Sequence, residues 1–235
     1  MNLYRGCSHG CIYCDSRSSC YQMPHAFEDI EVKQNALVLL EEALRRKRKK
    51  CMIGTGSMTD PYIPLETELG SVRQAMELVY KYGCGFTVLT KSDRILRDLD
   101  LLQKINASAK CVVQMTLTTY DEELCKKIEP YVSTTRERFE ALKQLRDAGI
   151  PTVVWLAPIL PFINDTEANL RGILDYCIEA GVYGIICFGM GLTLRDGNRE
   201  YFYQQLDRHF PGLKKRYIDT SGHQSVITSP NSKKM

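Results

Sequence analysis

The amino-acid sequence predicts an α/β protein folded as an open (β/α)6 partial TIM barrel. Short apolar runs alternate with segments of helical periodicity, the pattern of parallel strands joined by crossover helices. The run at 152–157 is almost entirely apolar, as expected of a strand that is buried on both faces. Six such runs are too few to close an eight-stranded barrel. The chain has 235 residues and no visible boundary, so a single domain is predicted over 1–235.

The strands are predicted from short apolar runs that glycine or proline separates from the helical segments. They span residues 3–6, 51–54, 86–90, 111–117, 152–157 and 184–188. Gly149 and Pro151, for example, end a helix directly before the fifth strand.

The segments between the strands carry apolar residues at helical spacing, beginning with a stripe from Val32 to Leu44. Thr134 and Glu137 fit a capping box at the start of another helix. The remaining helices are predicted over 73–82, 95–105 and 121–128, from a cap at Asp165 or Thr166, and from Gly197 towards His209. From Ser221 onward the chain is polar and is expected to pack loosely.

Composition narrows the class of protein. The chain is 44% hydrophobic and 25% charged, which is typical of a folded globular protein, and no apolar stretch has the length of a membrane span. Residues 4–7 interrupt any signal peptide, and the ten cysteines are not spaced as a disulfide framework, so a reducing cytoplasmic location is expected. A net charge of +3 does not by itself indicate nucleic-acid binding. The basic run 45–50 is interpreted as a solvated helix C-terminus rather than a binding patch.

Three cysteines stand close together near the N-terminus, at Cys7, Cys11 and Cys14. Thiolates at this spacing can converge on a soft metal centre. Structural zinc takes four ligands, usually in two pairs, and the chain has no second CxxC. A [4Fe–4S] cluster bound by three cysteines keeps one iron free for chemistry. A zinc knuckle, a disulfide loop and a structural cluster completed by Cys20 are the alternatives.

Together with Tyr13, these cysteines form the pattern CxxxCxΦC, where Φ is aromatic, and the loop resembles the signature of the radical S-adenosylmethionine (SAM) superfamily. The resemblance implies a [4Fe–4S] cluster on the three cysteines, with SAM bound at the open iron through its amino and carboxylate groups. It implies reductive cleavage of SAM to a 5′-deoxyadenosyl radical, with electrons from a flavodoxin- or ferredoxin-like donor. It also implies the partial barrel that the strand count predicts.

Chemistry in parallel α/β folds gathers at the C-terminal ends of the strands, which selects a set of candidate cofactor-binding residues. The rule selects the cysteine loop and residues 54–56, 90–92, 116–119, 157–158 and 189–191. The candidates for cofactor binding among them are Tyr13, Gly54, Thr55, Gly56, Lys91 and Thr116. The backbone of 54–56 could approach the amino group of SAM, as the glycine-rich segment of the family does, or form a simple turn. Lys91 could hold a carboxylate or be a solvated loop cation. Thr116 could bond the same carboxylate or serve only as a strand former, and 189–191 is interpreted as a turn.

A closer resemblance, to the spore photoproduct lyase-like group, covers nearly the whole chain. The matching segments are 2–14, 59–61, 90–91, 128–130, 137–141 and 157–159. In the lyase the radical abstracts hydrogen from a thymine dimer in DNA. Lys91 and Thr116 match positions that touch the SAM carboxylate there, whereas Arg138 matches a position without an assigned role.

Two departures separate this chain from the lyase. Ser57 stands where the lyase has the cysteine that returns a hydrogen atom to the product radical, and a serine O–H bond is much too strong for that step. Asp15 stands where the lyase has a tyrosine. Three hypotheses follow: a radical SAM enzyme acting on DNA or another nucleic acid, the same chemistry on a small molecule or peptide, and a non-enzymatic iron–sulfur or zinc protein.

Overall fold

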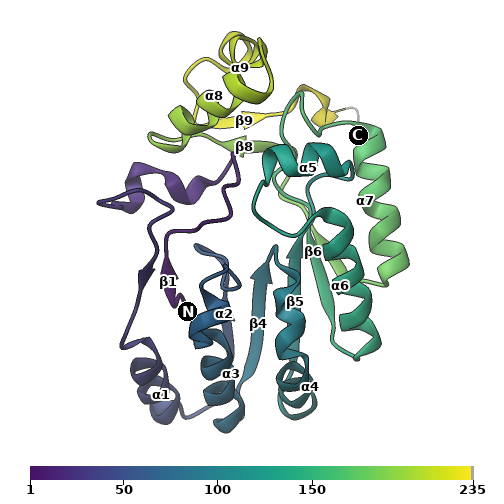
Figure 1. Cartoon of the computed structure of the whole chain (residues 1–235). Helices are drawn as coiled ribbons and strands as arrows, with labels where there is room; N and C mark the ends of the chain where they lie inside the picture. Colours follow the sequence, from purple (N-terminus) through teal and green to yellow (C-terminus); the bar gives the residue numbers. More distant parts are fainter. Residues whose placement is uncertain (234–235) are drawn as a thin grey trace.

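A five-stranded parallel sheet forms the centre of the computed structural model, which describes residues 1–233 (Figure 1). The strands are β3 (Met52–Thr55), β4 (Gly85–Thr90), β5 (Cys111–Thr116), β6 (Thr152–Trp155) and β7 (Gly184–Ile186), in that order across the sheet. All four pairings are parallel. The predicted α/β class is therefore confirmed, and the open sheet agrees with a partial barrel.

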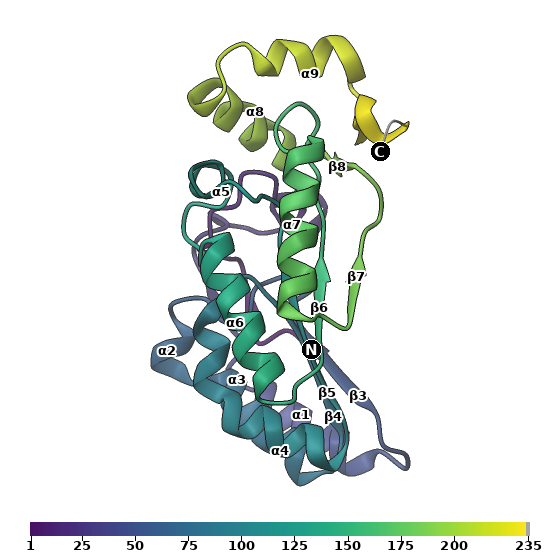
Figure 2. The same ribbon diagram turned by 90° about the vertical axis from the view of Figure 1, so that its right-hand side faces the viewer.

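The helices cover one face of this sheet, as Figure 2 shows. They are α1 (Ala36–Arg46), α3 (Ser71–Lys81), α4 (Leu99–Ser108), α6 (Thr135–Asp147) and α7 (Glu167–Ala180). The capping box of Thr134 with Glu137 is present at the start of α6, and the side chain of Thr166 caps α7. Buried aliphatic side chains of the strands and helices, such as Val88 and Leu142, form the main core between the layers.

The first predicted strand is a correction. Residues 3–6 do not join the parallel sheet: β1 (Tyr4–Arg5) pairs antiparallel with β2 (Glu31–Val32). Gly6 ends the pairing, because its φ of +85° turns the chain into the cysteine loop. Val32 consequently lies in β2 rather than in the first helix, which begins only at Ala36.

The C-terminal region is a second correction, because it packs where a loose tail from Ser221 was expected. β8 (Gly191–Thr193) pairs antiparallel with β9 (Val226–Thr228), and α8 (Asn198–His209) and α9 (Leu213–Ser221) connect them. Ile227 is only 1% exposed, and the hydroxyl of Ser229 donates to Asp165. The three residues of β9, Val-Ile-Thr, are too few to show the alternation of a strand, and only Ile227 among them is buried. We call residues 190–233 the C-terminal cap.

Shorter elements complete the described chain. They are η1 (Asp15–Arg17), η2 (Ser19–Tyr21), α2 (Glu66–Leu69), η3 (Asp93–Asp98), α5 (Glu122–Ile128) and η4 (Pro230–Lys233). The basic run 45–50 begins in the last turn of α1 and lies at the end of the sheet opposite the cap (Figure 1). No helix within residues 1–233 is both long enough and apolar enough to cross a bilayer. A single domain over 1–235 stays a prediction.

Candidate active site

The cysteine loop is fixed against the C-terminal end of α5 and the segment that follows it. Ile12 donates its backbone N–H to Ile128 (3.0 Å), and Tyr131 donates its own to the carbonyl of His9 (3.2 Å). Gly10 lies beneath this contact with a φ of +70°, and a Cβ there would stand 2.8 Å from the Tyr131 ring. The glycine is therefore needed both for the backbone turn and for the close approach.

The three cysteines of the loop are withdrawn from solvent to different degrees. Cys7 and Cys11 are buried, whereas Cys14 is half-buried at the edge of a cavity. Burial raises the pKa of the Cys7 thiol to about 12, and the backbone N–H groups of His9 and Asp60 partly offset this effect. Burial also holds the pKa of Cys11 well above its ordinary value. Because thiols bind metals as thiolates, these two sulfurs need a cationic partner to ionise.

Tyr13 is held by a buried charged network. Its hydroxyl donates to Glu129, whose carboxylate forms an ion pair with Arg138, and both charged side chains are 0% exposed. Arg138 also donates to the carbonyl of Thr116 (2.5 Å) at the end of β5. Burial alone would raise the pKa of Glu129, but the charges of Arg138 and Lys91 lower it. This network connects the cysteine loop to the sheet and gives Arg138 a positioning role that the sequence did not reveal.

Asp60 is a second organising residue that sequence reasoning missed. Its carboxylate accepts hydrogen bonds from the hydroxyl of Thr90 (2.7 Å) and the backbone N–H of Lys91 (2.7 Å). It also lies 3.5 Å from Nδ1 of His9 in the cysteine loop. Asp60 therefore joins the end of β4 to the loop. The only signal in the sequence was its place in the segment 59–61, which matches the lyase-like group.

Lys91 follows β4 and is half-buried, with its Nζ 5.9 Å from the centroid of the Tyr13 ring. Its ammonium has no ion-pair partner within residues 1–233. Burial would lower its pKa, but Cys11, Glu129 and Asp60 raise it above the ordinary value, so the side chain stays protonated. A half-buried cation without a carboxylate partner is suited to an anionic ligand.

The remaining predicted cofactor residues lie at the same end of the sheet. Gly54 and Thr55 close β3, and Thr116 closes β5. Gly56 follows with a φ of +99°, and a Cβ at this residue would stand 2.0 Å from the carbonyl oxygen of Leu89. A larger residue could not pass β4 here, so packing alone requires the glycine.

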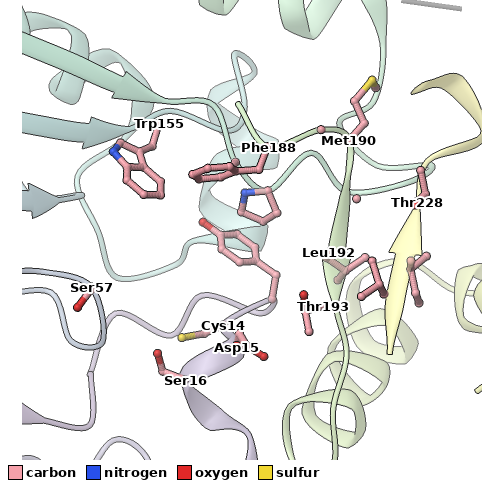
Figure 3. A pocket seen from close by; sticks show the side chains of 17 residues that line it. Cys14, Asp15, Ser16, Ser57, Trp155, Phe188, Met190, Leu192, Thr193 and Thr228 are labelled. Carbon is pink, nitrogen blue, oxygen red and sulfur yellow. The ribbon is translucent and has the colours of Figure 1, made fainter. Parts of the chain in front are cut away.

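A cavity of about 520 Å³ opens beside the cysteine loop, and we call it the strand-end pocket. Figure 3 shows Trp155 and Phe188 on one wall with Cys14 and Ser16 opposite them. The full lining comprises residues 13–16, Ser57, Trp155, 157–158, 188–193 and 226–228. Of the predicted cofactor-binding residues, Tyr13 lines this pocket, whereas 54–56, Lys91 and Thr116 lie outside its lining.

Two segments of the pocket wall differ from what the sequence predicted. Residues 189–191 are more than a turn, since all three line the pocket and Gly191 begins β8. The C-terminal cap supplies the rest of that side through β8 and β9. Asp15, the residue that departs from the lyase, lines the pocket and pairs with Arg195 of the cap (2.8 Å). The cap and the cysteine loop therefore enclose the pocket together.

The residues of the loop fit a [4Fe–4S] cluster. Nε2 of His9 is buried without a hydrogen-bond partner in the described chain, so the loop holds a polar atom that a bound group could satisfy. No group of three or more His, Cys, Asp or Glu within residues 1–233 is spaced to hold a single metal ion. A cubane places each cysteine on a different iron, so its ligands need not meet around one ion. Cys20, the alternative fourth ligand, is exposed in η2.

The comparisons with known proteins agree with this geometry. An uncharacterised protein of Mycobacterium tuberculosis is 30% identical over 228 residues, which are 92% of this chain and 65% of the relative. The radical SAM Nα-GlyT isomerase of Pseudomonas phage M6 is 24% identical over 175 residues, 74% of this chain and 35% of that protein. The chain thus spans less than two thirds of the length of either relative.

Among solved structures, the fold is similar to a spore photoproduct lyase mutant with bound AdoMet and dinucleoside spore photoproduct. The TM-score is 0.66 at 16% identity, covering 92% of this chain and 63% of the lyase. The family model described as "Radical SAM superfamily" matches residues 1–174. The chain therefore belongs to the radical SAM superfamily, whose cofactors are a [4Fe–4S] cluster and SAM.

Proposed function

We propose that this chain is a radical SAM enzyme that cleaves SAM reductively to a 5′-deoxyadenosyl radical and directs the radical to a substrate in the strand-end pocket. The observation that carries the proposal is the position of Lys91. Within residues 1–233 this cation has no ion-pair partner. It lies over the ring of Tyr13, a residue of the three-cysteine loop, at the C-terminal end of the parallel sheet. A cation at this place supports the binding of an anionic group directly beside the cluster loop.

The proposed roles divide between the loop and the strand ends. Cys7, Cys11 and Cys14 hold the cluster, which supplies the electron for cleavage of the sulfonium when it is bound and reduced. Lys91 binds the SAM carboxylate, and the hydroxyl of Thr116 assists it. The backbone of 54–56 accepts from the SAM amino group. Tyr13, a buried residue of the loop, presents its ring to the ammonium of Lys91.

The substrate is proposed to be a base of DNA or a related nucleoside. The similar lyase structure contains a dinucleoside photoproduct, and this supports the class without identifying the compound. A base in duplex DNA would have to leave its stack to enter the pocket. Ser57 is exposed on the pocket wall, and Cys14, a proposed cluster ligand, is the one cysteine among the described lining residues. The reaction should therefore end without a thiol donor at the lyase position.

The decisive experiment is anaerobic reconstitution with iron and sulfide, followed by a 5′-deoxyadenosine assay with SAM and dithionite. We expect iron uptake and 5′-deoxyadenosine formation, with a flavodoxin- or ferredoxin-like protein replacing dithionite as the donor. Stoichiometric zinc without iron uptake would instead identify a zinc protein. Iron uptake without SAM cleavage would identify a non-enzymatic iron–sulfur protein.

A further inference from the structure

Two aromatic side chains form one wall of the strand-end pocket in a way that the cofactor site does not explain. Trp155 comes from the end of β6 and is half-buried, whereas Phe188 follows β7 and is 75% exposed. Their ring centroids lie 5.3 Å apart at an interplanar angle of 62°. An edge-on pair leaves ring faces open, and Figure 3 shows both rings beside the cavity.

The indole of Trp155 is held in a fixed orientation from behind. Its Nε1–H donates to Oε1 of Gln114 on β5 (2.5 Å), and the amide of Gln114 donates to the hydroxyl of Thr87 on β4 (2.7 Å). Thr87 is the register partner of Gly54 on β3. A polar row thus crosses three adjacent strands, β4, β5 and β6, and ends at the tryptophan. Because both ends of the Gln114 amide are engaged, the ring cannot turn without breaking the row.

Phe188 is the opposite case, since it has little support from the protein. The phenyl ring is 75% exposed at the mouth of a cavity. An apolar surface that covered it would remove it from water, which is favourable. Gly189 follows it with a φ of +102°, so the backbone beside the ring is in a conformation that favours glycine. The wall therefore pairs a fixed ring with an uncovered one.

We propose that Trp155 and Phe188 form a stacking site for a planar heterocyclic ring of the nucleobase type, with Gln114 as the positioning residue for Trp155. Stacking on an aromatic face accepts any base, because every base has a π-face. Polar groups elsewhere on the lining, such as Ser57 and Thr193, can then contact the edge of the ring. This inference rests on the proposed function, which supplies two sources of such a ring: the adenine of SAM and a base of the substrate.

Trp155 is the single tryptophan of the chain, so its fluorescence reports on this site alone. The test is a fluorescence titration of the full chain with adenosine, with thymidylyl-thymidine and with methionine, which carries no ring. We expect quenching by at least one of the two ring-bearing ligands and none by methionine. Quenching by adenosine alone assigns the site to the cofactor, and quenching by thymidylyl-thymidine assigns it to the substrate. Absence of quenching by both would overturn the stacking site.

Variants separate stacking from simple proximity. Phe188→Ala should lower the affinity for the quenching ligand on the order of tenfold. Phe188→Tyr should bind that ligand with unchanged affinity. Gln114→Leu should shift the emission of Trp155 and weaken binding, and Gln114→Glu, which keeps an acceptor for the indole, should restore both. Tyr183→Ala removes an aromatic residue that is 86% exposed outside the pocket lining, and it should change nothing. Unchanged affinity in Phe188→Ala would overturn the proposal.

The titration does not depend on radical chemistry, because it needs neither cluster nor reductant. Failure of quenching with normal formation of 5′-deoxyadenosine would reject the stacking site and leave the proposed function standing. Quenching without SAM cleavage would reject the proposed function and leave the site as a nucleoside-binding pocket.

Discussion

Glu129 and Arg138 form an ion pair in which neither side chain is exposed to solvent. Glu129 accepts a hydrogen bond from the hydroxyl of Tyr13, and Arg138 donates to the carbonyl of Thr116 at the end of β5. Removal of one partner leaves the other charge buried without compensation. The cysteine loop and the sheet therefore depend on the same two charges.

The first prediction is that Glu129→Gln lowers the free energy of unfolding by about 3–5 kcal/mol, because the Arg138 guanidinium loses its counter-charge. Urea denaturation monitored by circular dichroism measures the change. Arg136→Gln is the matched control, since its pair with Glu140 (3.3 Å) is exposed and worth about 0.5 kcal/mol or less. A loss of similar size in both variants would show that the buried pair is not special.

The second prediction concerns acid stability. The pKa of Glu129 is lower in the folded chain than its ordinary value of 4.5. Its contribution to stability is therefore complete above pH 4.5 and is lost as the pH falls through the folded pKa. The acid limb of the unfolding free energy should be shallower in Glu129→Gln than in the unmodified chain. Parallel limbs in the two proteins would contradict the assignment.

The third prediction is that Cys7→Ala, Cys11→Ala and Cys14→Ala each abolish stable assembly of the cluster, because each change removes one of the three proposed thiolate ligands. Iron and sulfide analysis with Mössbauer spectra provides the measurement. Cys20→Ala is the control and should keep the cluster, because Cys20 lies exposed in η2. Loss of the cluster in Cys20→Ala would identify a four-thiolate site.

The fourth prediction is that Lys91→Ala weakens SAM binding without loss of the cluster. A hydrogen bond to a charged group contributes roughly 1.5–3 kcal/mol, so affinity should fall about ten- to hundredfold. Calorimetric titration of the reconstituted protein measures it. Lys127→Ala removes an exposed cation from nearby α5 and should leave the affinity unchanged. Equal affinities in the unmodified chain and Lys91→Ala would remove Lys91 from the site.

The fifth prediction concerns Ser57. The unmodified chain should cleave SAM without efficient reversal of spore photoproduct, because a serine O–H is too strong to donate the hydrogen atom. Ser57→Cys restores a thiol on the pocket wall, and Ser16→Cys places one elsewhere on the same lining as the control. Product analysis by chromatography measures repair. We expect Ser57→Cys to remain inactive on this dimer, which favours another substrate; reversal by the unmodified chain at a lyase-like rate would refute our interpretation of Ser57.

Local patterns predicted the parts of this molecule that local chemistry determines. The five parallel strands follow from apolar runs such as 111–117, and the starts of α6 and α7 follow from Thr134 and Thr166. The strand-end rule placed 54–56, Lys91 and Thr116 at one end of the sheet, where the structure has them. Their roles in binding SAM stay predictions.

The parts that could not be predicted depend on partners far away in the chain. Tyr13 and Glu129 are separated by 116 residues, and Asp60 and Lys91 by 31. Arg138 looks like a surface residue in the helical pattern of α6, and only the buried Glu129 explains why it is 0% exposed. The pairing of β1 with β2 and of β8 with β9 was missed because two or three residues carry too little periodicity to indicate a strand.

The C-terminal cap shares a core with the cysteine loop: Cys11, Ile12 and Tyr13 pack with Leu192, Phe202 and Ile227. This arrangement has a consequence for synthesis on the ribosome. Arg195 of the cap is made 180 residues after its partner Asp15, which corresponds to about 10–40 s at ordinary elongation rates. During that interval the cap residues that pack against Cys11 in the shared core are absent. We expect iron and sulfide to be delivered most readily in this window, with completion of the cap then sealing the loaded loop.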